Sequence, residues 1–139
     1  RYISMNRKEV TITYASHMYN TDEQINMTAK GILGNRDGVN IVMYNEENEG
    51  MAPIRTILKF DQNFLNVSKM GMTRTEMRYQ RGYTHQSRYH TFAGECDMCI
   101  KTEEYALQEI DNGYKITTVY NLEMDGNFIS KCKVEIVIK

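Results

Sequence analysis

The sequence has little of what would tie it to a membrane, to nucleic acid or to an oxidising compartment. No apolar run approaches the ~20 residues that a membrane-spanning helix needs. The 17 basic and 18 acidic residues nearly cancel, whereas general binders of nucleic acid or anionic membranes carry a basic excess. The three cysteines are an odd number and form no small disulfide framework. We therefore expect a cytoplasmic protein with free thiols, without a membrane or nucleic-acid partner.

The beginning of the chain, RYISMNRKEV, lacks the apolar segment of a signal peptide. Met5 is a candidate for the natural start, in which case residues 1–4 would be an addition to it. The 139 residues suit one domain, and a chain of this size buries roughly 68–70% of its unfolded surface. We expect a single domain over residues 1–139 whose core needs neither disulfides nor a metal.

A helical pattern is also missing, because no apolar stripe with a period of about 3.6 residues lasts for three turns. Alternation with a period of two dominates, as in VTITY, where Val10, Ile12 and Tyr14 share one face. The residues that share a face within each of three further segments are Ile25 and Met27; Ile116, Thr118, Tyr120, Leu122 and Met124; and Phe128, Ser130, Cys132, Val134, Ile136 and Ile138.

Turn signals separate these segments at short intervals. Asp37-Gly38, Asn112-Gly113 and Asp125-Gly126 are hairpin dipeptides, and residues 61–63 and 80–82 suit three-residue loops. Residues 45–53, with the only proline, indicate a longer loop. The pattern predicts an all-β fold of about eight to ten antiparallel strands without a long crossover. Such a meander loses its exposed edges by closing into an up-and-down β-barrel; a two-sheet sandwich is the alternative.

The stretch YQRGYTHQSRYHTFAGECDMCIKT, residues 79–102, raises the question of a metal site. His85 and His90 are five residues apart, and Cys96 and Cys99 are three apart. Residues an odd number apart on a strand point to opposite faces, whereas zinc ligands must converge at about 2.0–2.3 Å from one point. We therefore predict strands here, with no metal site and no cofactor.

We expect this stretch to form a hairpin that turns at Ala93-Gly94, with His90 opposite Asp97 on the outer face and Tyr89 opposite Met98 on the inner one. Continuing the pairing across residues 80–82 places Met77 opposite His85 and Thr75 opposite Ser87. The predicted inner wall, with Ile100 and Thr118 beside it, provides the candidate ligand-binding residues Thr75, Met77, His85, Ser87, Tyr89, Met98, Thr102 and Tyr120.

Several interpretations of the barrel stay open. A mostly apolar wall with a few polar groups suits a small apolar or amphipathic ligand, but small barrels are often filled by their own side chains. An enzyme would use His85, Ser87 and Tyr89 as an acid–base wall. An interaction module for protein or RNA would use a strand edge or the outer basic stripe, and the chain could form a homodimer. That stripe consists of Arg74, Arg78, Arg88 and Lys101, interrupted by Glu76, Gln86 and Asp97.

Known catalytic and nucleotide-binding motifs are missing, among them the nucleophile elbow, the zinc-protease motif, the P-loop and the dinucleotide fingerprint. No residue therefore qualifies as catalytic. We favour non-catalytic binding of a small ligand in the barrel.

In their order and spacing, the segments RTILKFD, NVSKMG, MRYQRG, YHTFAGECDMCIKT and GYKITTVYNLEMDG resemble the YwiB-like family of small bacterial proteins. The resemblance runs from about Val10 to the end of the chain, and Tyr44 with Glu46 and Glu47 matches a tyrosine-acidic segment of the family. Further positions that match the family pattern are Thr56, Gly71, Met77, Gly82, Tyr89, Thr91, Gly94, Met98, Thr102 and Tyr120.

The resemblance implies a calycin-like, lipocalin-type β-barrel, and it implies no activity, because the family is a domain of unknown function. Two positions depart from the pattern. Lys69 stands where the family usually has arginine, and lysine cannot make a bidentate contact. Phe92-Ala93 replaces a frequent Pro-Tyr pair, and Cys96 and Cys99 lie outside the pattern.

Overall fold

The computed structural model describes residues 7–139 except residues 48, 73 and 92 and the side chain of Thr91. These residues form ten strands, and no helix among them could cross a bilayer. The expectations for residues 1–4, for Phe92 and for the side chain of Thr91 lie outside the described part. The strands are β1 (Lys8–Met18), β2 (Gln24–Arg36), β3 (Val39–Glu46), β4 (Ile54–Phe60), β5 (Leu65–Met70), β6 (Arg74–Tyr79), β7 (Thr84–Thr91), β8 (Gly94–Ile110), β9 (Gly113–Met124) and β10 (Asn127–Ile138).

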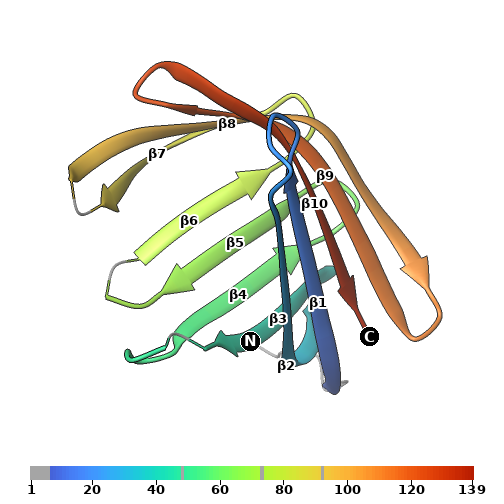
Figure 1. The fold of residues 1–139 in the computed structure, drawn as a ribbon. Helices are drawn as coiled ribbons and strands as arrows, with labels where there is room; N and C mark the ends of the chain where they lie inside the picture. Colours follow the sequence, from blue (N-terminus) through green and yellow to red (C-terminus); the bar gives the residue numbers. More distant parts are fainter. Residues whose placement is uncertain (1–6, 48, 73, 92) are drawn as a thin grey trace.

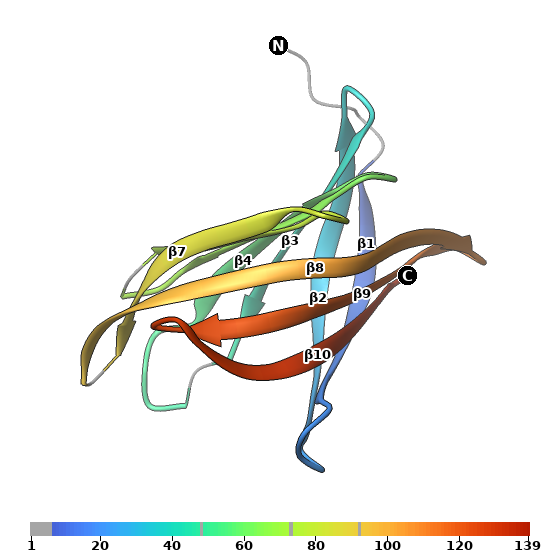
Figure 2. The ribbon, with the colours of Figure 1, turned by 90° about the horizontal axis from the view of Figure 1, so that it is seen from above.

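All ten strands belong to one sheet in the order β6-β5-β4-β3-β2-β1-β10-β9-β8-β7. Every pair of neighbours is antiparallel, and the first strand pairs with the last, with Ile12 opposite Ile138. The sheet curls until its two end strands, β6 and β7, come side by side (Figures 1 and 2). The predicted antiparallel β-barrel is therefore confirmed, as a nearly closed barrel of ten strands.

The predicted hairpin turns are also confirmed. Asp37 and Gly38 have φ values of 53° and 85°, and Asp125 and Gly126 have 50° and 81°. These left-handed conformations match the right-handed twist of the flanking strands, which is why Asp and Gly are favoured there. At the third turn Asn112 takes the positive φ of 66°, and Gly113 already begins β9.

The barrel has a seam between β6 and β7, and the predicted pairing of Met77 with His85 is wrong. In the described part of the chain no backbone ladder joins these two strands. The β6–β7 loop is hydrogen-bonded to β8 instead. Gly82 N–H donates to Thr102 O at 2.9 Å, and Thr102 N–H donates to Tyr83 O at 3.2 Å. Across the seam the His85 ring donates from Nε2 to the Glu76 carbonyl at 2.9 Å.

The pairing of β7 with β8 also differs from the expectation, by two residues. His90 lies opposite Glu95 rather than Asp97, and Tyr89 lies opposite Cys96 rather than Met98. The reason is a tighter turn, since β7 ends at Thr91 and its partner in the ladder is Gly94. A shift of two keeps every side chain on its predicted face, because faces alternate with a period of two.

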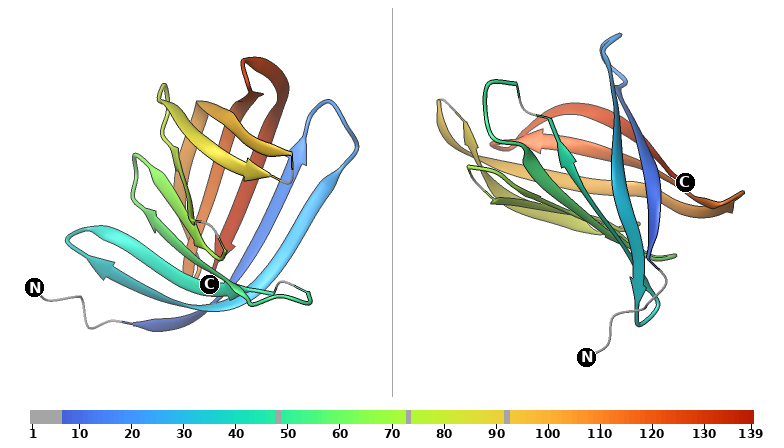
Figure 3. Two further views of the ribbon diagram at one scale, coloured as in Figure 1. Left: turned by 90° about the vertical axis from the view of Figure 1, so that its left-hand side faces the viewer. Right: turned by 90° about the horizontal axis from the view of Figure 1, so that it is seen from below.

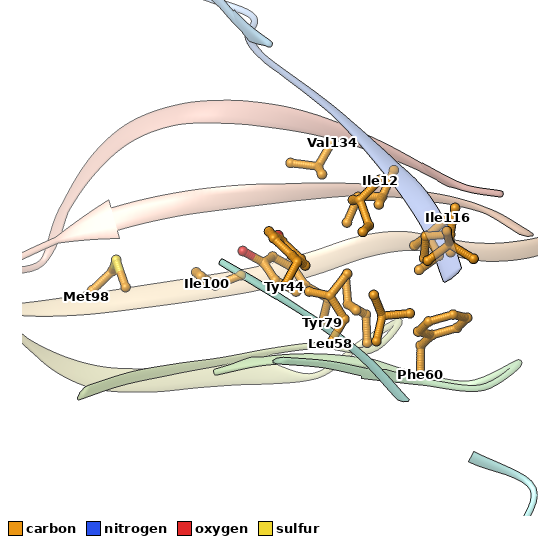
Figure 4. Close-up of a cluster of buried hydrophobic side chains, with 14 residues drawn as sticks. Ile12, Tyr44, Leu58, Phe60, Tyr79, Met98, Ile100, Ile116 and Val134 are labelled. Atoms are coloured by element: carbon orange, nitrogen blue, oxygen red, sulfur yellow. The ribbon is translucent and has the colours of Figure 1, made fainter. Parts of the chain in front are cut away.

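One end of the barrel is filled with side chains, and we call it the filled end; the β4–β5 loop lies there. The Phe60 and Tyr114 rings meet edge-to-face at 5.5 Å, and the Tyr105 hydroxyl reaches from β8 to the carbonyls of Asp61 and Phe64, each at 2.8 Å. Figure 4 shows the core running from Met98 past the central tyrosines to Phe60. The fully buried apolar residues of the whole core include Leu58, Phe60, Leu65, Ile116, Ile136 and Ile138.

The predicted inward alternation of β10 fails at one residue. Phe128 is 62% exposed, whereas Ser130, Cys132 and Val134 on the same strand are buried as expected. A bulge between Phe128 and Ser130 shifts the register of β10 against β9. The extra residue in a bulge breaks the alternation, so the residues before it have the opposite phase.

Candidate ligand-binding cavity

The opposite end of the barrel is hollow. It is the end at which β1, β3 and β5 finish and β2, β4 and β6 begin (Figure 3). A cavity of about 450 Å³ lies there, within the ~300–1,000 Å³ typical of ligand pockets. Its lining consists of Tyr14, Ile25, Asn26, Met27, Tyr44, Glu46, Leu58, Leu65, Val67, Lys69, Thr75, Met77, Tyr79, Tyr120, Val134 and Ile136.

A polar row crosses the wall of this cavity near its opening. In the ladder Tyr44 pairs with Thr56, Thr56 with Lys69 and Lys69 with Thr75, so one row of side chains runs over β3, β4, β5 and β6. The Lys69 ammonium lies 3.0 Å from the Glu46 carboxylate, which also accepts the Thr56 hydroxyl at 2.7 Å. The two charges that the described residues bring to the lining thus neutralise each other.

A second polar group lies on the wall, formed by Tyr79 from β6 and Tyr120 from β9. Their ring centroids are 5.1 Å apart, and the Tyr79 hydroxyl donates to Met77 Sδ at 3.4 Å. Tyr120 lies opposite Cys132, whose thiol is buried, in the β9–β10 ladder. Burial raises the pKa of both tyrosines and the pKa of Cys132, so the phenols and the thiol stay protonated at neutral pH.

The same effect extends to the polar row. Burial raises the pKa of Tyr44, and the nearby Glu46 carboxylate raises it further. Burial also raises the pKa of Tyr14, against a smaller opposing effect of its hydrogen bond with Ser16. The cavity therefore presents four neutral phenols on a largely apolar wall.

The structure separates the eight predicted lining residues. Thr75, Met77 and Tyr120 line the cavity. Tyr89 and Met98 pack in or against the hydrophobic core, and Ser87 borders an open polar depression over β7 and β8.

The two other predicted residues lie beside the cavity lining. The His85 ring is engaged at the seam with the Glu76 carbonyl. Thr102 is buried opposite Tyr120, and its hydroxyl has no hydrogen-bond partner among the described residues. His85, Ser87 and Tyr89, which the enzyme alternative would use together, thus lie in three different surroundings.

The outer basic stripe lies on three strands, with Arg74 and Arg78 on β6 at one end of the sheet order, and Arg88 on β7 and Lys101 on β8 at the other end. Arg74 pairs with Glu76 at 2.8 Å, and Arg88 pairs with Glu95 and Asp97 at 3.0 and 3.1 Å. Lys101 pairs with Glu123 at 3.0 Å, and the Arg78 guanidinium covers the Phe64 ring at 4.2 Å. Each cation of the stripe thus has an anionic or aromatic neighbour.

The cysteines lie on three different parts of the wall. Cys96 and Cys99 are half-buried, Cys132 is buried, and all three are free thiols. Among the described residues, no group of three His, Cys, Asp or Glu side chains lies close enough to hold a metal.

Sequence reasoning missed most of the lining, namely the residues that β1 to β5 contribute, together with Tyr79 of β6 and Val134 and Ile136 of β10. The alternation in VTITY does place Tyr14 on the face of the buried Val10 and Ile12, and the resemblance marks Tyr44, Glu46 and Lys69. Their meeting depends on the register of three neighbouring strands, which no local pattern contains.

The sequence matches the family described as "Domain of unknown function (DUF1934)" over residues 10–136. The chain belongs to this family. Among solved structures, this DUF1934 protein is similar to one titled "Crystal structure of ywiB protein from Bacillus subtilis". The TM-score is 0.78 at 16% sequence identity, over 96% of this chain and 92% of that chain. At this identity the similarity shows the fold alone.

The predicted membership of the YwiB-like family is therefore confirmed. No curated protein matches the sequence. The family description assigns no activity to the DUF1934 domain, so its cavity must be interpreted from its own residues.

Proposed function

We propose that this DUF1934 protein binds a small, largely apolar ligand in the hollow end of its barrel, without converting it. The observation that carries the proposal is the contrast between the two ends of one barrel. Side chains fill one end, whereas the other contains a cavity of about 450 Å³ whose lining is mostly apolar, with a few convergent polar groups. Apolar walls with few polar groups are typical of ligand sites.

Binding without catalysis is supported by the state of the charged groups. Among the described residues of the lining, Glu46 and Lys69 are the charged ones, and each is neutralised by the other. Burial keeps the phenols of Tyr79 and Tyr120 protonated, which leaves them suited to donating hydrogen bonds and unsuited to acting as bases.

The test is native mass spectrometry of the protein purified from a bacterial host, compared with its denatured mass. We expect a non-covalent organic adduct that is lost on denaturation. The second arm measures binding of an uncharged apolar fluorescent dye to the protein after extraction of any adduct. A bare native mass together with no dye binding would contradict the proposal.

Val67, which lines the cavity from β5, provides a matched pair of variants. Val67→Phe places a ring in the cavity and should weaken dye binding at least tenfold. Val67→Ala enlarges the cavity and should retain binding. Equal affinities of the two variants would place the dye elsewhere on the protein.

A further inference from the structure

The hydrogen bond of the Tyr79 hydroxyl indicates what kind of polar ligand atom suits the cavity. The Tyr79 side chain is 7% exposed and lines the cavity, yet its hydroxyl donates to the thioether sulfur of Met77 at 3.4 Å. Sulfur is a weak acceptor, and a buried hydroxyl gains more from an oxygen acceptor. The Tyr120 ring lies beside it, with the two centroids 5.1 Å apart.

A second observation is an unsatisfied hydroxyl on this part of the wall. Thr102 lies directly opposite Tyr120 in the β8–β9 ladder and is 4% exposed. Its hydroxyl has no hydrogen-bond partner within the part of the chain that the structure describes. Buried hydroxyls normally have one, so this wall has hydrogen-bonding capacity that the protein does not satisfy by itself.

We propose that the ligand is a neutral, largely apolar molecule with a carbonyl oxygen, and that this oxygen accepts the Tyr79 hydroxyl beside Tyr120. The inference rests on the proposed function, since it names the ligand class of the same cavity. The carbonyl replaces the Met77 sulfur as acceptor, and the apolar body of the ligand lies against Leu58, Val67 and Ile136.

The charges of the cavity favour a neutral acceptor over a carboxylate. Lys69 is the one cation among the described lining residues, and Glu46 already occupies it at 3.0 Å. A carboxylate beside Tyr79 would lose its water without gaining a free cation, which is costly in a poorly solvated site. A carbonyl oxygen carries no such cost and accepts the same hydrogen bond.

The test compares two probes of matched shape, benzophenone and diphenylmethane, which differ by a carbonyl in place of a methylene. Dissociation constants are measured for wild type, Tyr79→Phe and Tyr105→Phe. The ratio of the two constants cancels the general hydrophobicity of each probe when it is compared between proteins. Tyr105→Phe is the matched control, because its hydroxyl lies at the filled end and bonds to Asp61 and Phe64.

We expect the preference for benzophenone to fall about 3- to 10-fold in Tyr79→Phe, the value of one neutral hydrogen bond, and to stay unchanged in Tyr105→Phe. The carbonyl stretch of bound benzophenone should also move to lower frequency in wild type and return toward its apolar-solvent value in Tyr79→Phe. This spectroscopic arm is independent of any change in stability.

The outcomes separate the inference from the proposed function. If both probes bind and the ratio is the same in wild type and Tyr79→Phe, the carbonyl inference is wrong and the ligand cavity stands. Tighter binding of diphenylacetate, an anionic probe with the same two rings, would overturn the neutral ligand class. If neither the probes nor the apolar dye bind, both the inference and the proposed function fail.

Discussion

Gly31 and Gly34 lie on the same strand and should respond to alanine in opposite ways. Gly31 belongs to β2 and lies between Val10 and Tyr44 in the ladders, both of which are buried. A Cβ atom at Gly31 would lie 2.6 Å from the Met43 carbonyl oxygen and 2.7 Å from Ile12 Cδ1. A Cβ at Gly34 would meet nothing within 4 Å.

The magnitude follows from these distances. Gly31→Ala forces backbone or core side chains to move, which typically costs about 1–3 kcal/mol in a packed interior. Gly34→Ala adds no contact and restricts the unfolded chain, which is worth about 0.4–1 kcal/mol of added stability. The two variants should therefore differ by about 1.5–4 kcal/mol in the free energy of unfolding.

Urea titrations followed by far-UV circular dichroism measure this difference. We expect the unfolding free energy of the two variants to fall with urea concentration at the same slope. Thermal melts provide a second readout, since 1 kcal/mol corresponds to roughly 4 °C for a domain of this size. If Gly31→Ala is as stable as Gly34→Ala, the β2 backbone at Gly31 cannot lie as close to β1 and β3 as the structure describes. A changed slope with an unchanged midpoint would point instead to an altered unfolded state.

Three further results are expected. Burial raises the pKa of Tyr79 and Tyr120, so above pH ~10 the unfolded chain loses phenolic protons that the folded chain keeps. The free energy of unfolding should therefore be unaffected below that pH and fall above it, as urea titrations at stepped pH would show. Burial also raises the pKa of Cys132, so a thiol reagent should label Cys96 and Cys99 in the native protein and Cys132 only after unfolding. Tyr105→Phe should cost about 1 kcal/mol in thermal or urea unfolding, because it removes the hydroxyl that holds the β4–β5 loop.

Each of these results has a clear opposite. A urea midpoint that stays level from pH ~9 to ~11 would show that the tyrosines ionise equally in both states. Equal labelling rates of all three thiols would place Cys132 at the surface, and a Tyr105→Phe variant as stable as wild type would show that water replaces the lost hydroxyl.

The local rules of the sequence predicted the strands and turns because each depends on a few adjacent residues. Asp37-Gly38 and Asp125-Gly126 take the left-handed conformations that their residue types favour. The inward set from Ser130 to Ile138 is buried as its alternation predicts. Phe128 fails because a bulge is a relation between two strands, and nothing in the β10 sequence alone marks it.

The candidate site was harder to predict, because a cavity is what remains after many side chains have been placed. Attention to the reactive residues of β7 and β8 led to His85, Ser87 and Tyr89, none of which lines the cavity. The register error of two residues did not cause this failure, since it left the faces intact. The cause was the assumed β6–β7 pairing, which placed β7 on the cavity wall.

The position of the seam has a consequence for the folding order of the chain. The pairing of β1 with β10 joins the two strands that are farthest apart in the sequence. The break in the sheet, in contrast, falls between two consecutive strands, β6 and β7. Lys139 N–H donates to Thr11 O at 3.1 Å, so the end of β10 lies beside the beginning of β1. A circular permutant that links Lys139 to Lys8 and opens the β6–β7 loop would run through all ten strands in the order of the sheet. Its strand pairings would all join strands that are consecutive in the chain, and the contacts across the seam would be the long-range ones. Since folding rates rise as contact order falls, it should fold faster into the same barrel.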